Sequence, residues 1–162
     1  YGLVRNAEPH AVALFLDQPA VTSNASVYFP EAHTPFNRIS EPRNRSRRMS
    51  PPGKTSLVAE LTCSAEDERW HRSDEQLCQS VVAALEPLGW LEPGALLGTE
   101  VRRIGCAYPV LELGIESVLR GVCDYLAGFE NLRLTGRNSL FAYSHLHDQM
   151  KAGRELIDRI RG

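Results

Sequence analysis

The chain has 162 residues, of which 43% are hydrophobic and 23% charged, a composition that is typical of a folded globular protein and excludes a disordered or fibrous one. Its formal net charge of −2 gives no general reason to expect a nucleic acid or a membrane surface as a partner. No apolar run approaches the roughly 18 residues of a membrane span. The chain begins Tyr1-Gly2-Leu3 without a signal-peptide pattern, so we expect a cytoplasmic protein whose sequence starts internally.

The first part of the chain predicts an antiparallel sheet. Apolar residues fill 10–17, and a Gln-Pro pair ends that segment. Two short strands are expected at 26–29 and 36–41, and another at 55–62. Because polar turns separate these segments, we expect consecutive strands to pair with one another.

A basic loop follows the third of these strands. Between positions 38 and 54 the chain has six basic side chains and one acidic one, which gives a local charge of +5. Sites for single-stranded nucleic acid interleave basic and aromatic residues, and this loop lacks aromatic side chains after Phe36. We therefore interpret it as a solvated or partner-facing loop rather than an RNA site.

The loop ends with Gly53-Lys54-Thr55, which resembles the end of a phosphate-binding loop. Such a loop needs a glycine five positions before Gly53, where this chain has Arg48. Two prolines also remove backbone donors, and a strand pattern follows instead of a helix. We therefore predict a turn into a strand and no ATP site.

Helices and strands alternate in the second part. Ser73 and Gln76 form a capping-box pattern that opens a helix ending at 87–89. A strand is expected at 99–110. A second amphipathic helix carries apolar residues from position 115 onward, and we expect it to end at Gly128.

A short strand at 131–135 and a last helix complete the prediction. We expect Ser144 or a near neighbour to cap this helix. Its predicted buried stripe consists of Leu146, Met150, Gly153, Ile157 and Ile160. The four cysteines lie far apart without zinc-ligand spacing, so we expect buried, reduced thiols at Cys63, Cys78, Cys106 and Cys123.

The most informative stretch runs from position 131 to 160. A strand, then Gly136, then a helix is how an α/β protein directs backbone N–H groups at an anionic or electron-rich ligand. Gly153 lies inside the helix, where glycine costs roughly 1 kcal/mol relative to alanine, and suggests close packing there. On these grounds alone an ordinary strand-to-helix connection remains the alternative.

The stretch GRNSLFAY, at 136–143, resembles the C-terminal flavin-contacting motif of FAD-dependent oxidoreductases of the amine oxidase and protoporphyrinogen oxidase-like superfamily. UDP-galactopyranose mutase is similar at the same place. Further upstream, RIGCAYPVLELGIESVL at 103–119 resembles the segment before that motif, and 28–61 resembles the substrate-domain strands. The resemblance departs from the family pattern at Ser139, where a second glycine is usual, and at His145 and His147.

The resemblance implies an α+β fold with an antiparallel substrate-domain sheet, helices, and the C-terminal strand-helix piece of an FAD-binding Rossmann-like domain. It implies that 1–72 is the sheet portion of the substrate domain, 73–130 its helical and strand part, and 131–162 the FAD-contacting strand and helix. No G-x-G-x-x-G motif occurs. We therefore expect the C-terminal portion of a longer flavoprotein, with the dinucleotide-binding remainder as its partner and poor FAD retention alone.

Carried over by position, the resemblance implies that Gly136 and Arg137 approach the pyrophosphate and ribityl part of FAD. Tyr143 would lie near the flavin or substrate, and the start of the last helix would face the flavin ring. The complete set of implied cofactor contacts is Gly136, Arg137, Asn138, Tyr143, Leu146, His147, Asp148 and Gln149, and the implied substrate contacts are Tyr108 and Arg43.

Three functions remain open at this point. The first is an FAD-dependent oxidoreductase that moves a hydride from a small-molecule substrate to flavin, with no catalytic acid or base identified and no metal expected. The second is a mutase-like isomerase in which arginines of the basic loop hold a diphosphate: Arg43, Arg45, Arg47 or Arg48. The third is a non-catalytic interaction module. A homodimer is also left open.

Overall fold

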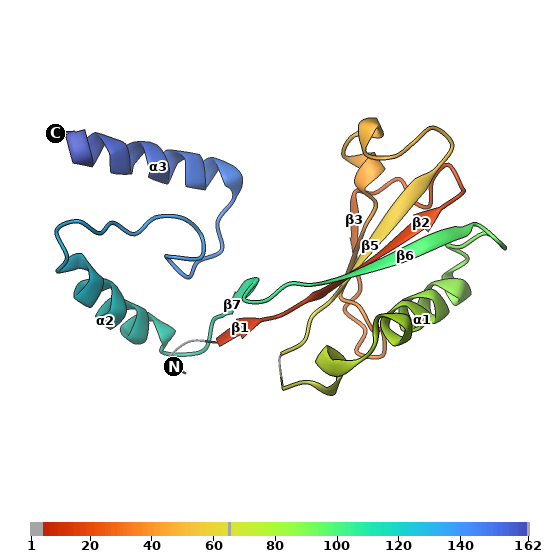
Figure 1. Cartoon of the computed structure of the whole chain (residues 1–162), viewed down its shortest axis with the longest axis horizontal. Helices are drawn as coiled ribbons and strands as arrows, with labels where there is room; N and C mark the ends of the chain where they lie inside the picture. Colours follow the sequence, from red (N-terminus) through yellow and green to blue (C-terminus); the bar gives the residue numbers. More distant parts are fainter. Residues whose placement is uncertain (1–4, 65, 162) are drawn as a thin grey trace. The chain divides into compact units, whose positions relative to one another are not determined.

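The computed structural model describes residues 5–64 and 66–161 and divides the chain into two compact units (Figure 1). We call residues 7–107 the sheet unit, and residues 5–6 with 108–161 the helical unit. The described residues form an α+β structure with a five-stranded antiparallel sheet and three α-helices, which confirms the predicted class. None of the described helices is long and apolar enough to cross a membrane.

The five-stranded sheet has the order β3-β4-β5-β2-β6, and each neighbouring pair is antiparallel. The expectation that consecutive strands pair holds for β3, β4 and β5 but is wrong for β2, which lies between β5 and β6. This strand is the most apolar of the set, and its position inside the sheet covers both of its edges. The strands are β2 (His10–Leu16), β3 (Ser26–Tyr28), β4 (Arg38–Ser40), β5 (Thr55–Leu61) and β6 (Leu96–Arg103).

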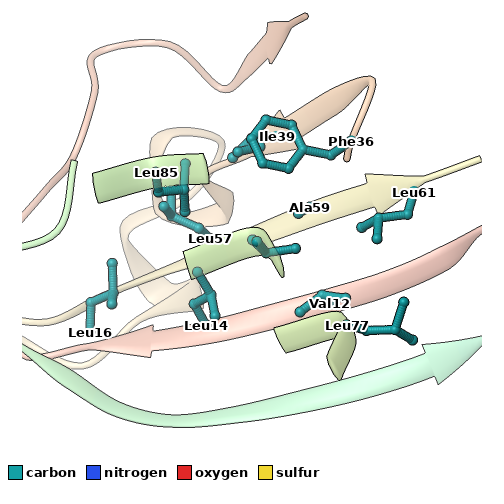
Figure 2. Close-up of a cluster of buried hydrophobic side chains, with 11 residues drawn as sticks. Val12, Leu14, Leu16, Phe36, Ile39, Leu57, Ala59, Leu61, Leu77 and Leu85 are labelled. Atoms are coloured by element: carbon teal, nitrogen blue, oxygen red, sulfur yellow. The ribbon is translucent and has the colours of Figure 1, made fainter. Parts of the chain in front are cut away.

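One face of this sheet forms the hydrophobic core with helix α1 (Asp74–Leu85). Side chains alternate between the two faces of a strand, and β2 and β5 place every second residue under the helix. Figure 2 shows these side chains gathered between the strands and α1. The buried set is Val12, Leu14, Leu16, Phe36, Ile39, Leu57, Ala59, Leu61, Leu77, Val81 and Leu85.

Local signals set the ends of α1 as predicted. The Ser73 hydroxyl accepts from the Gln76 N–H, and the Gln76 side chain accepts from the Ser73 N–H. After a 3₁₀ turn at Glu86–Leu88, Gly89 adopts the left-handed conformation with φ of 66° and ends the helical segment. A groove of about 780 Å³ lies between α1 and β6.

A buried carboxylate joins the basic loop to the sheet. Glu41 accepts hydrogen bonds from the hydroxyl of Thr55 at 2.7 Å and from the N–H groups of Val21 and Thr22 at 3.0 and 2.8 Å. Gly53-Lys54-Thr55 is the predicted turn into β5, with a φ of 75° at the glycine. Glu41 therefore connects the start of β5 to the end of β4 and to the loop after β2.

The helical unit contains helices α2 (Ile115–Ala127) and α3 (Leu146–Arg161). A two-stranded sheet pairs β1 (Arg5–Ala7) with β7 (Tyr108–Val110). The predicted strand at 99–110 is therefore wrong, because β6 ends at Arg103 and β7 begins at Tyr108. Cys106 lies between them with a φ of 53°, which an extended strand cannot adopt.

Two predictions for the helical unit are also wrong. Residues 131–135 are not a strand, since no described strand lies beside them to complete a hydrogen-bond ladder. The expected stripe of α3 is not buried either, and among the described residues nothing lies within 4 Å of a Cβ placed on Gly153. Neither α2 nor α3 buries a residue in the described chain.

Candidate functional site

Three predicted site residues meet beside β7. The guanidinium carbon of Arg137 lies 5.5 Å from the ring centre of Tyr108 and 5.1 Å from that of Tyr143. The two tyrosine rings are nearly parallel, with centres 6.3 Å apart. The Tyr143 hydroxyl donates to the carbonyl of Pro109 at 2.9 Å, which fixes its ring. Two cation–π contacts therefore hold the arginine in place.

The turn between segment 131–135 and α3 has a defined backbone. Gly136 has a φ of 92°, and its carbonyl accepts from the Leu140 N–H at 3.1 Å. The Asn138 carbonyl accepts from the N–H of Phe141, whose side chain is the buried anchor of the turn. A Cβ on Gly136 would lie 3.8 Å from Oε1 of Gln149, so the turn passes close to the first turn of α3.

The first turn of α3 presents backbone donors. The N–H of Gln149 is bonded to the His145 carbonyl at 3.1 Å, so the amides of 146–148 come before the first intrahelical bond. A carboxylate oxygen of Asp148 accepts from the His145 N–H at 2.8 Å and caps this end of the helix. The helix begins two residues after Ser144, whose hydroxyl accepts from the Gln149 side chain.

The same end of α3 is open in the described chain. Leu146 is 77% exposed, and His147 and Met150 are exposed as well. The rings of His145 and His147 stack with centres 5.6 Å apart, and His147 Nε2 lies 3.4 Å from Asp148. An apolar side chain therefore faces solvent at this end of the helix, next to the three amides that precede the first intrahelical bond.

The implied cofactor contacts and Tyr108 all lie in the helical unit. The cluster of Tyr108, Arg137 and Tyr143 and the close approach of Gly136 to Gln149 connect β7, the turn and α3. Arg43 is placed differently. It lies in the sheet unit, in the 3₁₀ turn η1 (Pro42–Asn44) of the basic loop.

The uncovered face of the sheet carries a polar row that the sequence prediction of the site did not include. Arg38 is paired with Glu60 and lies 5.8 Å from the ring of Tyr28, and register places these three side chains in one row across β3, β4 and β5. Phe15 of β2 is 42% exposed on this face. Successive side chains of β4 alternate between the two faces of the sheet, so Arg38 and Ile39 lie on different faces. This alternation was the sequence signal for the row.

A buried histidine and thiol lie at the end of β2. His10 Nδ1 is 3.4 Å from the Sγ of Cys63, which donates to the Glu8 carbonyl at 3.1 Å. Burial, and then the nearby Arg103, lower the pKa of His10. Burial, and then Asp67, raise the pKa of Cys63. The pair is therefore neutral near pH 7 and structural, because a nucleophilic thiol requires the opposite shift.

All four cysteines are free thiols, but the expectation that they are buried is correct only for Cys63. Cys78 and Cys123 are partly exposed on α1 and α2, and Cys106 is exposed in the turn before β7. The spacing of apolar residues in the sequence correctly predicted that Cys78 and Cys123 lie on helices. Their partial exposure depends on which face of the helix each one occupies.

The fold matches solved flavoenzyme-related structures that the sequence resemblance named. No family model matches the chain, and no curated protein matches it in sequence. A structure of reduced UDP-galactopyranose mutase is 21% identical with a TM-score of 0.71, over 84% of this chain and 29% of that one. A protein from Exiguobacterium sp. 255-15 assigned as a protoporphyrinogen oxidase is 19% identical with a TM-score of 0.73, over 97% of this chain and 35% of that one.

These matches confirm the resemblance to the two groups of proteins, and at these identities they establish a shared fold. The chain spans about a third of the length of each of the two structures. The described part of the chain thus shares its fold with about a third of each of these two structures.

Proposed function

We propose that the chain is the C-terminal part of an FAD-dependent oxidoreductase that oxidises a small organic molecule. The observation that carries the proposal is the open first turn of α3 beside the Tyr108, Arg137 and Tyr143 cluster. The proposal is also supported by the fold that the chain shares with a protoporphyrinogen oxidase and a UDP-galactopyranose mutase.

The donors present suit a flavin nucleotide. FAD contains an anionic pyrophosphate and an electron-rich ring edge, and Arg137 and the amides of 146–148 are complementary to such groups. Gly136 has no Cβ to obstruct a ligand that approaches the turn. When bound, FAD would accept a hydride from a carbon of the substrate. In this proposal Gly136, Arg137 and Asn138 bind the cofactor, and Tyr143 borders the substrate cavity.

The chain's own residues would orient and stabilise rather than transfer protons. The Arg137 guanidinium lies beside both tyrosine rings, within 5.5 Å of each ring centre, so its charge is positioned before a ligand arrives. The positive end of α3, at Leu146, His147, Asp148 and Gln149, favours negative charge close to it. Fixed charges and dipoles of this kind need no reorganisation during a reaction.

The remainder of the protein would cover the helical unit. A groove of about 480 Å³ separates α2, segment 132–134 and α3, and it is lined by Leu126, Leu132, Leu134 and Leu156 among others. Residues 131–135 form no strand ladder with the described residues, and a neighbouring strand would supply one. We infer that a dinucleotide-binding portion of Rossmann-like fold adds that strand and covers the apolar faces of α2 and α3.

A matched pair of glycine variants in the full-length protein tests the flavin proposal. Gly136→Ala and Gly94→Ala each place a Cβ at a positive φ, 92° and 77° respectively, so both strain the backbone. Only Gly136 belongs to the proposed contact. We expect flavin absorbance to fall in purified Gly136→Ala protein and to remain in Gly94→Ala protein. A wild-type protein that stays colourless after FAD is added would instead favour a non-catalytic interaction module.

The second candidate is an isomerase similar to UDP-galactopyranose mutase, which the first structural match favours. In that case arginines of the basic loop, beginning with Arg43, would hold the substrate diphosphate, and Tyr108 would contact the substrate. Calorimetric titration of the full-length protein with a UDP-sugar separates the two candidates. Saturable binding supports the isomerase, and its absence supports the oxidoreductase.

A further inference from the structure

Strand β6 has an open outer edge. It is the last strand in the order β3-β4-β5-β2-β6, so among the described strands it pairs only with β2 (Figure 1). The Ile104 N–H donates to the Pro9 carbonyl on the β2 side at 3.1 Å. Because backbone groups alternate in direction along a strand, those of Thr99, Val101 and Arg103 point outward. These three residues can therefore pair with a further strand.

The α1 side of this edge leaves space for such a strand. The groove of about 780 Å³ lies beside it, with Thr99 and Val101 of β6 on one wall and Val82 of α1 on the other. Thr99 is exposed and Val101 is only half-buried. Side chains of an added strand that point toward the α1 side would lie next to this groove.

The charges of β6 make the strand complementary to itself. Val101 lies opposite Val12 of the core, so Glu100 and Arg102 lie on the uncovered face, where they form an exposed ion pair. When two copies of β6 pair antiparallel around a two-fold axis at Val101, Glu100 faces the partner's Arg102, and Arg102 faces the partner's Glu100. Four charges of alternating sign then lie side by side. Opposite charges directly across an antiparallel pair are stabilising.

The neighbouring registers lack this match. Moving the axis by one residue places Glu100 opposite a second Glu100, or Arg102 opposite a second Arg102, and like charges in these positions are destabilising. An axis at Thr99 forms no pair of opposite charges. The axis at Val101 also suits the backbone, because Val101 faces its own copy and Thr99 faces the partner's Arg103, all with outward-pointing groups. The charges therefore oppose other registers and favour one.

We propose that two copies of this chain associate through β6 in the register centred on Val101. The partner is a second copy because the charge match follows from the two-fold axis and needs no other sequence. The two-fold axis also closes the contact, so association through this edge stops at the dimer. All the residues belong to the sheet unit and none to the proposed flavin contacts, so the inference does not depend on flavin binding.

Sedimentation equilibrium of the purified 162-residue chain tests the association. The mass should rise from that of a monomer to that of a dimer as the concentration is raised to about 1 mM, which is high enough to detect a weak contact of small area. Amide hydrogen exchange at low and high concentration locates the contact. Exchange should slow at Thr99, Val101 and Arg103, and remain unchanged at Glu100 and Arg102, whose amides face β2. A chain that stays monomeric, or a dimer without this pattern, would overturn the proposal.

An exchange of charges tests the register. Glu100→Arg and Arg102→Glu each place like charges opposite each other at two points, and each should weaken the dimer at least about tenfold. The double variant restores opposite charges and should dimerise like the wild type. An equimolar mixture of the two single variants should form a heterodimer for the same reason. Glu31→Arg reverses an exposed charge away from β6 and should leave association unchanged.

Melting curves establish that every variant is folded. Wild-type association in both single variants would show that the charges of β6 do not face each other across the contact. An equal loss in Glu31→Arg would assign the effect to net charge. A double variant that dimerises no better than the single variants, or a mixture that forms no heterodimer, would refute the register.

Discussion

Helices α1 and α2 both carry apolar side chains at helical spacing, and α2 is the more amphipathic of the two, but only α1 buries its apolar face. Val81 of α1 is fully buried against β2 and β5, whereas Val122 of α2 is 39% exposed. The sheet that covers α1 is part of this chain, and the described residues of the helical unit offer no such sheet to α2. An apolar helical face therefore predicts that something covers it, and the covering element can belong to another segment.

A matched substitution tests this difference directly. Val81→Ala removes two methyl groups from the core and should lower the free energy of unfolding by about 2–3 kcal/mol. Val122→Ala makes the same change on the exposed face and should alter it by no more than about 0.5 kcal/mol. Urea unfolding followed by circular dichroism measures both. Equal losses would mean that the apolar face of α2 is already covered within this chain.

Removing the buried carboxylate of Glu41 is expected to have the next largest effect on the free energy of unfolding. Glu41→Gln keeps the shape but places an amide where the carboxylate accepts hydrogen bonds from Val21, Thr22 and Thr55. We expect a loss of about 2 kcal/mol in the free energy of unfolding. Glu75→Gln on the exposed side of α1 is the control and should change stability little. An unchanged free energy of unfolding in Glu41→Gln would show that the sheet unit does not depend on these hydrogen bonds.

A smaller, local effect is expected in the helical unit. Tyr143→Phe removes the hydrogen bond to the Pro109 carbonyl, which is worth about 1 kcal/mol. Hydrogen exchange of amides at 137–143 should become about fivefold faster while global stability is unchanged. Tyr125→Phe on α2 removes a tyrosine hydroxyl from an exposed side chain and serves as the control. Unchanged exchange in Tyr143→Phe would indicate that the hydroxyl does not hold this turn.

The smallest expected effect is a pH dependence in the sheet unit. Burial lowers the pKa of His10 below its ordinary value of 6.5, so the unfolded chain binds this proton more readily than the folded one. The contribution of His10 to the free energy of unfolding should therefore be fully present above pH 6.5 and be lost as the pH falls below that value. His10→Asn cannot titrate and should have a flatter stability profile in this range. An equally steep decline in that variant would assign it to another group.

The sequence predicted the sheet unit better than the helical unit for a physical reason. The capping box at Ser73, the turn at Gly53 and the alternation of β2 and β5 depend on neighbouring residues and on partners within the chain. Segment 131–135 has an equally good strand pattern, but a strand needs a second strand beside it, and none of the described residues supplies one.

The candidate site was predicted in part. The segment 136–149 was identified from its resemblance, and the structure shows that Tyr108, Arg137 and Tyr143 lie together there. The mutual contact of these three residues was not predictable, because it depends on the path of the chain between β7 and the turn. The row of Tyr28, Arg38 and Glu60 was missed because each strand contributes only one member, so strand order had to be known first.

The outer edge of β6 has a practical consequence for work with this chain in isolation. Edge strands with free backbone groups promote association of protein molecules, and Leu96 and Leu97 add exposed apolar surface at one end. The other end carries Glu100, Arg102 and Arg103, and charged residues on an edge oppose such pairing. Solubility of a purified sample should therefore depend on these three charges, and neutralising them should cause precipitation before it causes unfolding.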